Sequence, residues 1–173
     1  MVYLRHGRTD WDQNERELGW VPEMLQDRSL LGQCDRQRLL SDAGREDARA
    51  VGAAVGRHGI GVGQVLSSQW CRTRETAELA FGRVDARGDL LFDTGYLAPG
   101  SAERNAFAEA LRRLLSEPVG EGANRFLVGH GPQIDDAARV VLQEGEAVIV
   151  RPEGSTFTVL RKVAASGWDG LDN

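Results

Sequence analysis

Arg5 and His6 stand together at the end of an apolar stretch that begins at Val2, and Gly7 follows them. The apolar stretch predicts a buried strand, and the glycine lets the backbone turn and approach another part of the molecule closely. In open α/β sheets, ligands bind at the carboxyl ends of the strands. A guanidinium offers a planar fork of donors, and an imidazole can act as base or nucleophile near neutral pH. The pair therefore suits a phosphate group, although a surface ion pair beside an ordinary turn would use the same residues.

The same arrangement recurs late in the chain, where the apolar run Phe126-Leu127-Val128 and Gly129 precede His130 and Gly131. The sequence predicts another core strand here, followed by a helix that begins near Pro132. If the two strands are parallel, His6 and His130 face each other at one edge of the sheet. The first amides of the helix could then help to hold an anion.

Arg72 supplies a further positive charge at the same predicted edge. We expect a strand over residues 64–68 and a helix over residues 70–81, which places Arg72 in the first helical turn on the same face as Thr76. The start of a helix that follows a strand is the expected place for an anion-binding group. The alternative is a solvated ion pair with a glutamate of the same helix.

The remaining elements complete an alternation of strands and helices. Ser41 and Ser101 are suitable N-caps for two further helices, and residues 10–31 form a long polar excursion that would cover the strand ends. Three further strands are predicted over residues 90–92, 147–151 and 156–162, of which the last two form a hairpin. No repeat or linker interrupts residues 1–173, so we expect one α/β domain.

The composition excludes several classes of protein. Hydrophobic residues make up 41% of the chain and charged residues 27%, and no apolar run is long enough for a membrane span. The formal net charge of −5 argues against a nucleic-acid surface, so an anionic substrate would be bound by a local group of arginines. Three histidines that lie far apart in the sequence do not make a metal site. We therefore predict no metal and no cofactor.

Cys34 and Cys71 are too few for a disulfide framework, and one disulfide or two ordinary thiols are both compatible with the sequence. The first predicted strand follows directly after Met1. The protein is therefore expected to be cytoplasmic as written, or extracytoplasmic if a leader segment has been removed.

Three motifs in a fixed order resemble the histidine phosphatase superfamily, also called phosphoglycerate mutase-like. They are Leu4-Arg5-His6-Gly7, Ser67-Ser68 followed by Cys71-Arg72-Thr73-Arg74-Glu75-Thr76-Ala77, and Val128-Gly129-His130-Gly131. The resemblance extends from about Val2 to Lys162 and implies a three-layer sandwich with a mixed, mostly parallel central sheet flanked by helices.

By this resemblance His6 is the nucleophile that carries a covalent phosphoryl group, and it must be neutral to attack. Its other ring nitrogen would donate to a neighbouring acceptor, for which a backbone carbonyl is the usual choice. Arg5, Arg72 and His130 match the positions that surround the phosphoryl group. Gly7 and Gly131 would let the backbone come close to it, and Thr9 keeps a hydroxyl that family members place near the phosphate.

The general acid is the hardest residue to assign from the resemblance. One branch of the family places a carboxylate after the strand that follows the Arg72-type helix, and Asp93 stands there, although glutamate is usual. Glu103, Glu144 and Glu146 are competitors, each of which is expected to be a surface charge.

Two departures favour a phosphatase over a mutase. Asp12 replaces an asparagine that contacts phosphate in mutase members, and the chain lacks the large insertion that builds the mutase substrate site. Three segments look most like small phosphatases of the family: Cys34 to Arg38, Leu40-Ser41-Asp42-Ala43-Gly44-Arg45, and Leu142 through Pro152. Some of these phosphatases carry leaders, in which case Cys34 and Cys71 would pair.

We therefore expect a metal-independent phosphatase that acts on a phosphomonoester, with a small phosphorylated metabolite or a phosphoprotein as substrate. The alternatives are a phosphoglycerate-type mutase, a phosphohistidine protein phosphatase and a non-catalytic anion-binding module. The sequence predicts neither the substrate nor the oligomeric state.

Overall fold

A computed structural model describes residues 1–13, 15–87 and 91–170. Within these residues six strands form one sheet. The strands are β1 (Val2–Arg5), β2 (Val62–Ser67), β3 (Ala86–Arg87), β4 (Asn124–Gly129), β5 (Ala147–Pro152) and β6 (Phe157–Val163). Their order is β3-β2-β4-β1-β5-β6. The first four are parallel to one another, β5 is antiparallel to β1, and β6 is antiparallel to β5. The predicted mixed, mostly parallel sheet is confirmed.

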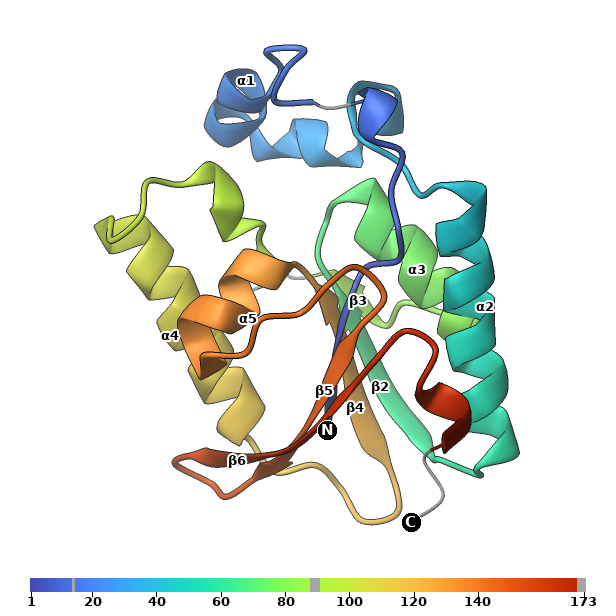
Figure 1. Ribbon diagram of the computed structural model, residues 1–173. Coiled ribbons are helices and arrows are strands. Elements are labelled where there is room, and N and C mark those ends of the chain that lie inside the picture. The colour runs from blue at the N-terminus through green and yellow to red at the C-terminus, as the bar shows by residue number, and fades with distance from the viewer. Residues whose placement is uncertain (14, 88–90, 171–173) are drawn as a thin grey trace.

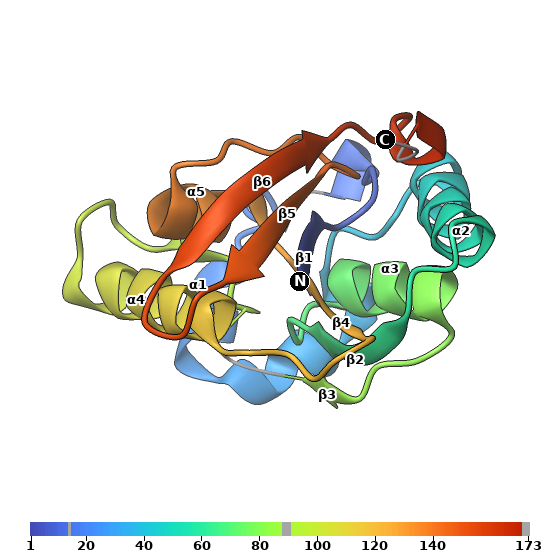
Figure 2. The ribbon, with the colours of Figure 1, turned by 90° about the horizontal axis from the view of Figure 1, so that it is seen from below.

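Helices cover both faces of this sheet (Figures 1 and 2). The α-helices of the described residues are α1 (Val21–Gln26), α2 (Asp42–Arg57), α3 (Cys71–Phe81), α4 (Ala102–Ser116) and α5 (Gly131–Ala138), of which α1 lies above the strand ends and not on a face of the sheet. The pair α2 and α3 lies on one face and the pair α4 and α5 on the other, which confirms the three-layer architecture. None of the helices in the described part of the chain is both long enough and apolar enough to cross a membrane.

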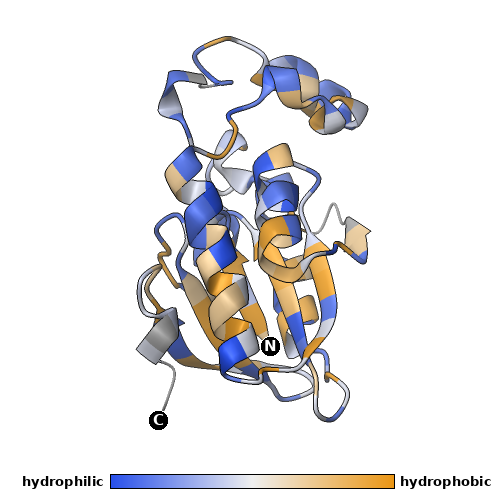
Figure 3. Ribbon diagram, turned by 90° about the vertical axis from the view of Figure 1, so that its right-hand side faces the viewer, coloured by the Kyte–Doolittle hydropathy of each residue, from blue (hydrophilic) through white to orange (hydrophobic). Residues whose placement is uncertain are grey.

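The central strands are buried on both faces, as their alternating side chains show. Tyr3 and Leu127 belong to the hydrophobic cluster beneath α4 and α5. Leu4 and Val128, their neighbours in β1 and β4, belong to the cluster beneath α2 and α3. Successive residues of a strand point to opposite faces, so one strand serves both clusters. Figure 3 shows this contrast, with hydrophobic strands behind helices that carry hydrophilic residues.

Most predicted elements are present. Ser41 and Ser101 accept hydrogen bonds from the backbone N–H groups of Gly44 (3.1 Å) and Arg104 (3.2 Å), as helix N-caps do. β5 and β6 form the predicted hairpin.

The strand predicted over residues 90–92 is wrong. Leu90 lies outside the described residues, and Leu91 and Phe92 are buried in two different hydrophobic clusters without joining the sheet. The neighbour of β2 is instead the short β3. A short apolar run signals burial, but it does not distinguish a strand from an irregular buried segment.

Residues 10–13 and 15–39 form a cap above the carboxyl ends of β1 and β4 (Figure 1). An antiparallel bridge between Thr9 and Leu40 closes the base of this cap. A small separate cluster, which includes Met24 and Leu31, packs beneath it. The predicted excursion therefore covers the strand ends, and short helices give it an ordered backbone.

A disulfide between Cys34 and Cys71 fastens the cap to the first residue of α3, with the two Cα atoms 5.6 Å apart. Of the two possibilities that the sequence left open, the structure therefore contains the bridge. Next to the bridge, the side chain of Gln37 accepts a hydrogen bond from the Cys71 N–H (2.9 Å). The cap is thus joined to α3 both covalently and by a hydrogen bond.

Candidate active site

His6 lies at the carboxyl end of β1 and is only 2% exposed. Its Nδ1 lies 2.8 Å from the carbonyl oxygen of Gly7, which fits an N–H donor on that nitrogen. The neutral ring then keeps its lone pair on Nε2. Burial, together with the nearby charges of Arg72 and His130, holds the pKa of His6 well below 6.5. His6 is thereby prepared as a neutral nucleophile.

His130 lies at the carboxyl end of the neighbouring strand β4, and its ring centroid is 5.4 Å from that of His6. The expected juxtaposition of the two histidines is therefore present. The hydroxyl of Tyr3 interacts with both the N–H and the carbonyl of His130 at 2.8 and 2.9 Å. Ser68 Oγ lies 3.0 Å from Nε2, and an Asp93 carboxylate oxygen lies 3.2 Å from Nδ1. The ring is thus fixed from both sides.

Arg72 is fully buried in the first turn of α3. Its two terminal nitrogens donate to Glu15 (3.0 Å) and to Asp93 (2.8 Å), so it is not a solvated surface charge. The shared face with Thr76 is also present, because the Thr76 hydroxyl accepts from the N–H of Gly7 (3.0 Å) and donates to the carbonyl of Arg72 (2.7 Å). This hydroxyl connects the turn after β1 to the helix that carries Arg72.

Arg5 extends from the end of β1 toward α5. Its Nη1 donates to the carbonyl of Leu142 (2.7 Å), and its Nη2 lies 3.7 Å from Glu144. A β-carbon at Gly131 would lie 3.0 Å from the guanidinium of Arg5, so this glycine makes room for an arginine. Gly7 serves a different purpose, since a β-carbon there would lie 2.6 Å from the carbonyl oxygen of Gly44 in α2. The close approach at Gly7 is to a helix of the protein itself.

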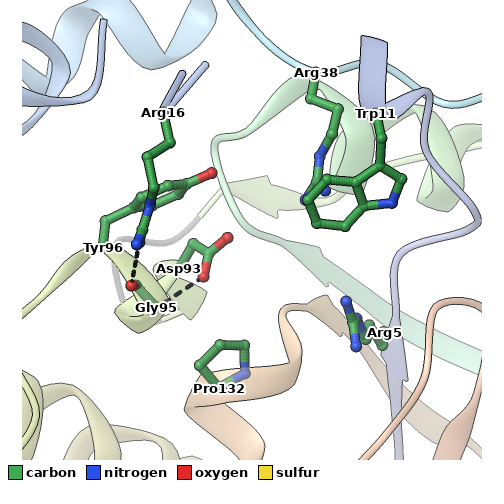
Figure 4. A pocket seen from close by; sticks show the side chains of 8 residues that line it. All are labelled: Arg5, Trp11, Arg16, Arg38, Asp93, Gly95, Tyr96 and Pro132. Atoms are coloured by element: carbon green, nitrogen blue, oxygen red, sulfur yellow. Dashed lines mark hydrogen bonds between the residues drawn. The ribbon is translucent and has the colours of Figure 1, made fainter. Parts of the chain in front are cut away.

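A pocket of about 320 Å³ opens above these groups (Figure 4). Its lining consists of Arg5, Trp11, Arg16, Arg38, Asp93, Gly95, Tyr96 and Pro132. Two arginines stack on aromatic rings at 5.1 Å (Arg16 on Tyr96) and 3.6 Å (Arg38 on Trp11). The two stacked pairs lie on opposite sides of the pocket. The site is therefore rich in guanidinium groups although the chain as a whole is acidic.

A family model described as the histidine phosphatase superfamily (branch 1) matches residues 1–91. The chain belongs to the histidine phosphatase superfamily. Among curated proteins, none matches this chain in sequence.

Solved structures of histidine phosphatase neighbours share the fold at low sequence identity. The protein histidine phosphatase SixA, complexed with tungstate, has a TM-score of 0.58 at 16% identity over 95% of this chain and 96% of its own. A mycobacterial glucosyl-3-phosphoglycerate phosphatase has a TM-score of 0.58 at 18% identity, covering 92% and 96%. A phosphoserine phosphatase mutant from Entamoeba histolytica has a TM-score of 0.61 at 14% identity, covering 96% and 97%. At these identities the likeness concerns the fold.

Asp93 is one of the predicted site residues, and the structure places it beside Arg72 and His130. Burial would raise its pKa, but the neighbouring His130 and Arg72 outweigh burial and hold the pKa of Asp93 far below its usual range. In the ligand-free protein Asp93 is therefore a carboxylate.

The competing glutamates differ in their surroundings. Glu103 pairs with Arg28 at the surface (2.6 Å). Glu146, expected at the surface, has only 16% of its side chain exposed and pairs with Lys162 (2.6 Å). Glu144, expected at the surface, is instead largely buried, because it accepts from both the N–H (3.0 Å) and the hydroxyl (2.8 Å) of Thr9. The hydroxyl predicted to contact phosphate is thus engaged by this carboxylate.

Sequence reasoning missed Glu15, which is fully buried beneath the cap. It accepts hydrogen bonds from Arg72, from the Tyr96 hydroxyl and from the Arg38 N–H. Burial would raise the pKa of Glu15. The charge of Arg72 and the hydrogen bond from the Tyr96 hydroxyl outweigh burial and lower this pKa below its usual value, so Glu15 is ionised. A single glutamate in a polar, irregular stretch carries no signal of burial. In the part of the chain that the structure describes, no three His, Cys, Asp or Glu side chains are grouped to hold a metal ion.

Proposed function

We propose that the protein is a phosphatase that hydrolyses a phosphomonoester through a covalent phosphohistidine on His6. The observation that carries this proposal is the environment of His6, a buried ring whose Nδ1 is hydrogen-bonded to Gly7 and whose pKa is lowered. An imidazole held in this way presents an unprotonated Nε2 to an electrophile. The arginines beside it favour a negatively charged group. A phosphomonoester combines an electrophilic phosphorus with negatively charged oxygens.

In the first step Nε2 of His6 attacks phosphorus while the bond between phosphorus and the leaving oxygen breaks. The positive charges of Arg5 and Arg72 stabilise the charge that spreads over the three equatorial oxygens. Hydrogen bonds to Asp93 and Glu15 already fix the Arg72 guanidinium, so little reorganisation is needed. In the second step water attacks the phosphohistidine, which releases phosphate and returns His6 to its neutral form.

We assign the proton for the leaving oxygen to Asp93. Asp93 is a carboxylate in the ligand-free protein, so the proton has to arrive with the substrate. A phosphomonoester has a second pKa near 6 and binds partly as the monoanion, which carries a proton. The phosphoryl group and the Asp93 carboxylate are both negative, so sharing that proton between them is favourable. Asp93 can then pass the proton to the leaving oxygen.

The charge stabilisation in this scheme comes from the protein's own guanidinium groups, and we propose that no metal ion takes part. The fold neighbours agree with phosphate chemistry at such a site, since one is a complex with tungstate and another a complex with VO3. One neighbour is a protein histidine phosphatase and another a phosphoserine phosphatase. We favour a small phosphomonoester, because the cap residues Trp11 and Arg16 line a pocket of about 320 Å³ above the site.

The test is hydrolysis of para-nitrophenyl phosphate in the presence of EDTA. The unmodified protein is expected to release nitrophenolate, and His6→Ala is expected to lose at least about 10³-fold in kcat, because the nucleophile is gone. His58→Ala is a matched control, since His58 caps the far end of α2, and it should retain activity. Hydrolysis that stops with EDTA, or that persists in His6→Ala, would refute the proposal.

A further inference from the structure

Arg38 is a buried cation at the edge of the candidate site. Its side chain is 7% exposed, and it lines the same pocket as Arg5. Its Nε and Nη1 are buried and have no hydrogen-bond partner within the described residues. A guanidinium in this position loses hydration without gaining hydrogen bonds in return, which is unfavourable. An anion in the pocket that this side chain lines would compensate the buried positive charge.

The neighbouring carboxylate does not fill this role. Glu144 Oε1 lies 4.0 Å from Arg38 Nη1, too far for a hydrogen bond, and both oxygens of Glu144 already accept from Thr9. The same Oε1 lies 3.7 Å from Arg5 Nη2. Arg38 and Arg5 therefore flank one carboxylate oxygen and are close enough to bind two parts of one small molecule.

The other arginines of the site have partners that Arg38 lacks. Arg72 donates to two carboxylates, Arg5 to the carbonyl of Leu142, and Arg16 to the carbonyl of Gly95. Arg38 instead stacks on Trp11, with 3.6 Å between the guanidinium carbon and the ring centroid. This stacking fixes the plane of the guanidinium without using its N–H donors. Figure 4 shows the stacked pair at the side of the pocket opposite Arg16 and Tyr96.

We infer that Arg38 binds a second anionic group of the substrate, a carboxylate or a further phosphate a few bonds away from the phosphoryl group that reaches His6. The substrate class is then a small phosphomonoester whose leaving group is itself negatively charged. This inference rests on the proposed function, because it assumes that the transferred phosphoryl group lies between His6 and Arg72. It also explains why a protein of net charge −5 concentrates guanidinium groups in this pocket.

Two probes with the same carbon skeleton test the inference. 3-Phosphoglycerate carries a carboxylate where glycerol 3-phosphate carries a hydroxymethyl group. We would measure the dissociation constants of both by calorimetry in a His6→Ala background, which prevents turnover. The His6→Ala protein is expected to bind 3-phosphoglycerate about 10- to 100-fold more tightly, since a hydrogen bond to a charged group contributes on that order.

Substitution of Arg38 should remove this preference. In His6→Ala/Arg38→Gln the two probes are expected to bind with similar affinity, whereas Arg38→Lys, which keeps the charge, should retain part of the preference. Arg36→Gln is the matched control, because Arg36 lies two residues away in the cap and pairs with Glu23 (2.9 Å) outside the pocket. It should keep the full preference. Circular dichroism and the Tm of each variant establish that it is folded.

Three results would overturn the inference. The first is equal binding of the two probes, or no binding of either, in the His6→Ala protein. The second is a preference that survives Arg38→Gln. The third is an equal loss of affinity for both probes in Arg38→Gln, which would mean that Arg38 contacts the transferred phosphoryl group itself. Failure of the proposed function is separate, because it would appear as absent hydrolysis of para-nitrophenyl phosphate by the unmodified protein.

Discussion

His6 is surrounded by groups that favour its neutral form. Burial removes the hydration that an imidazolium needs, and the positive charge of Arg72 opposes a second one nearby. The backbone carbonyl of Gly7 selects the tautomer with the proton on Nδ1. An exposed histidine with the same sequence neighbours would be largely protonated in mildly acidic solution and unable to attack.

We therefore expect His6 to stay neutral at pH 6.5 and at mildly acidic pH below this value. A lowered pKa means that the neutral form persists as the pH falls, so the acid limb of kcat/KM that reports His6 should lie below pH 6.5. Long-range proton–nitrogen NMR spectra of labelled protein should show a protonated Nδ1 and a bare Nε2 in this ring. Protonation of His6 at or above pH 6.5, or the opposite tautomer, would contradict the account.

Asp93 offers a second prediction, because its proposed role depends on the leaving group. In Asp93→Asn, kcat for an alkyl phosphate is expected to fall by about 10²- to 10⁴-fold, the usual contribution of a general acid. Para-nitrophenolate leaves without protonation, so its release should fall by less than about tenfold. Glu144→Gln is the control for the competing carboxylate and should lack this difference. Equal losses on both substrates would show that Asp93 acts only by holding Arg72 and His130.

Among the elements, α2 lies directly against the turn after β1. The two meet at Gly7 and Gly44, where the backbone of the turn lies against the helix. A β-carbon at Gly44 would overlap the carbonyl oxygen of Arg8, a backbone atom that cannot move alone. The position of His6 therefore depends on a glycine in a different element.

We expect Gly44→Ala to destabilise the protein by about 1–3 kcal/mol or more, as overpacking does, and to lower activity because the turn shifts. Gly56→Ala, in the same helix, is a matched control, since a β-carbon there meets nothing within 4 Å. That substitution should stabilise the protein by roughly 0.5–1 kcal/mol. Urea unfolding of both variants measures the free energies. A Gly44→Ala protein as stable as the unmodified one would show that the contact is not needed.

The cap depends on the disulfide between Cys34 and Cys71, which closes a sequence separation of 37 residues. A cross-link of this kind restricts the unfolded chain, and its removal typically costs about 2–5 kcal/mol. We expect mass spectrometry without reductant to find no alkylated cysteine, and a lower Tm after reduction. Cys34→Ala/Cys71→Ala should show the same decrease. Thiols that are alkylated without reductant would contradict the bridge.

In the molecule as a whole, the sequence predicted the sheet and the placement of three candidate residues at one edge of it. Arg5, His6 and His130 each follow a buried strand, and regular strands and helices carry clear apolar periodicity. The position of Arg72 followed from the same pattern, because it opens the helix after β2.

The buried charged residues around the site were not predictable in this way. Glu15 and Arg38 belong to the irregular cap, and they are buried only because the cap closes over the strand ends. The burial of Glu144 likewise results from its hydrogen bonds to Thr9, a residue far away in the sequence. No periodic pattern marks such contacts. The disulfide was undecidable for the same reason, since pairing depends on the distance between two distant positions.

The most direct measurement of the central claim is the detection of phosphate on His6 during turnover. We would quench the reaction with para-nitrophenyl phosphate under alkaline conditions, in which phosphohistidine survives, and map the modified peptide by mass spectrometry. The account predicts phosphate on the peptide that contains His6, lost on acid treatment, and none on the peptide that contains His130. Release of nitrophenolate with His6 unmodified throughout the time course, or phosphate on another residue, would contradict it.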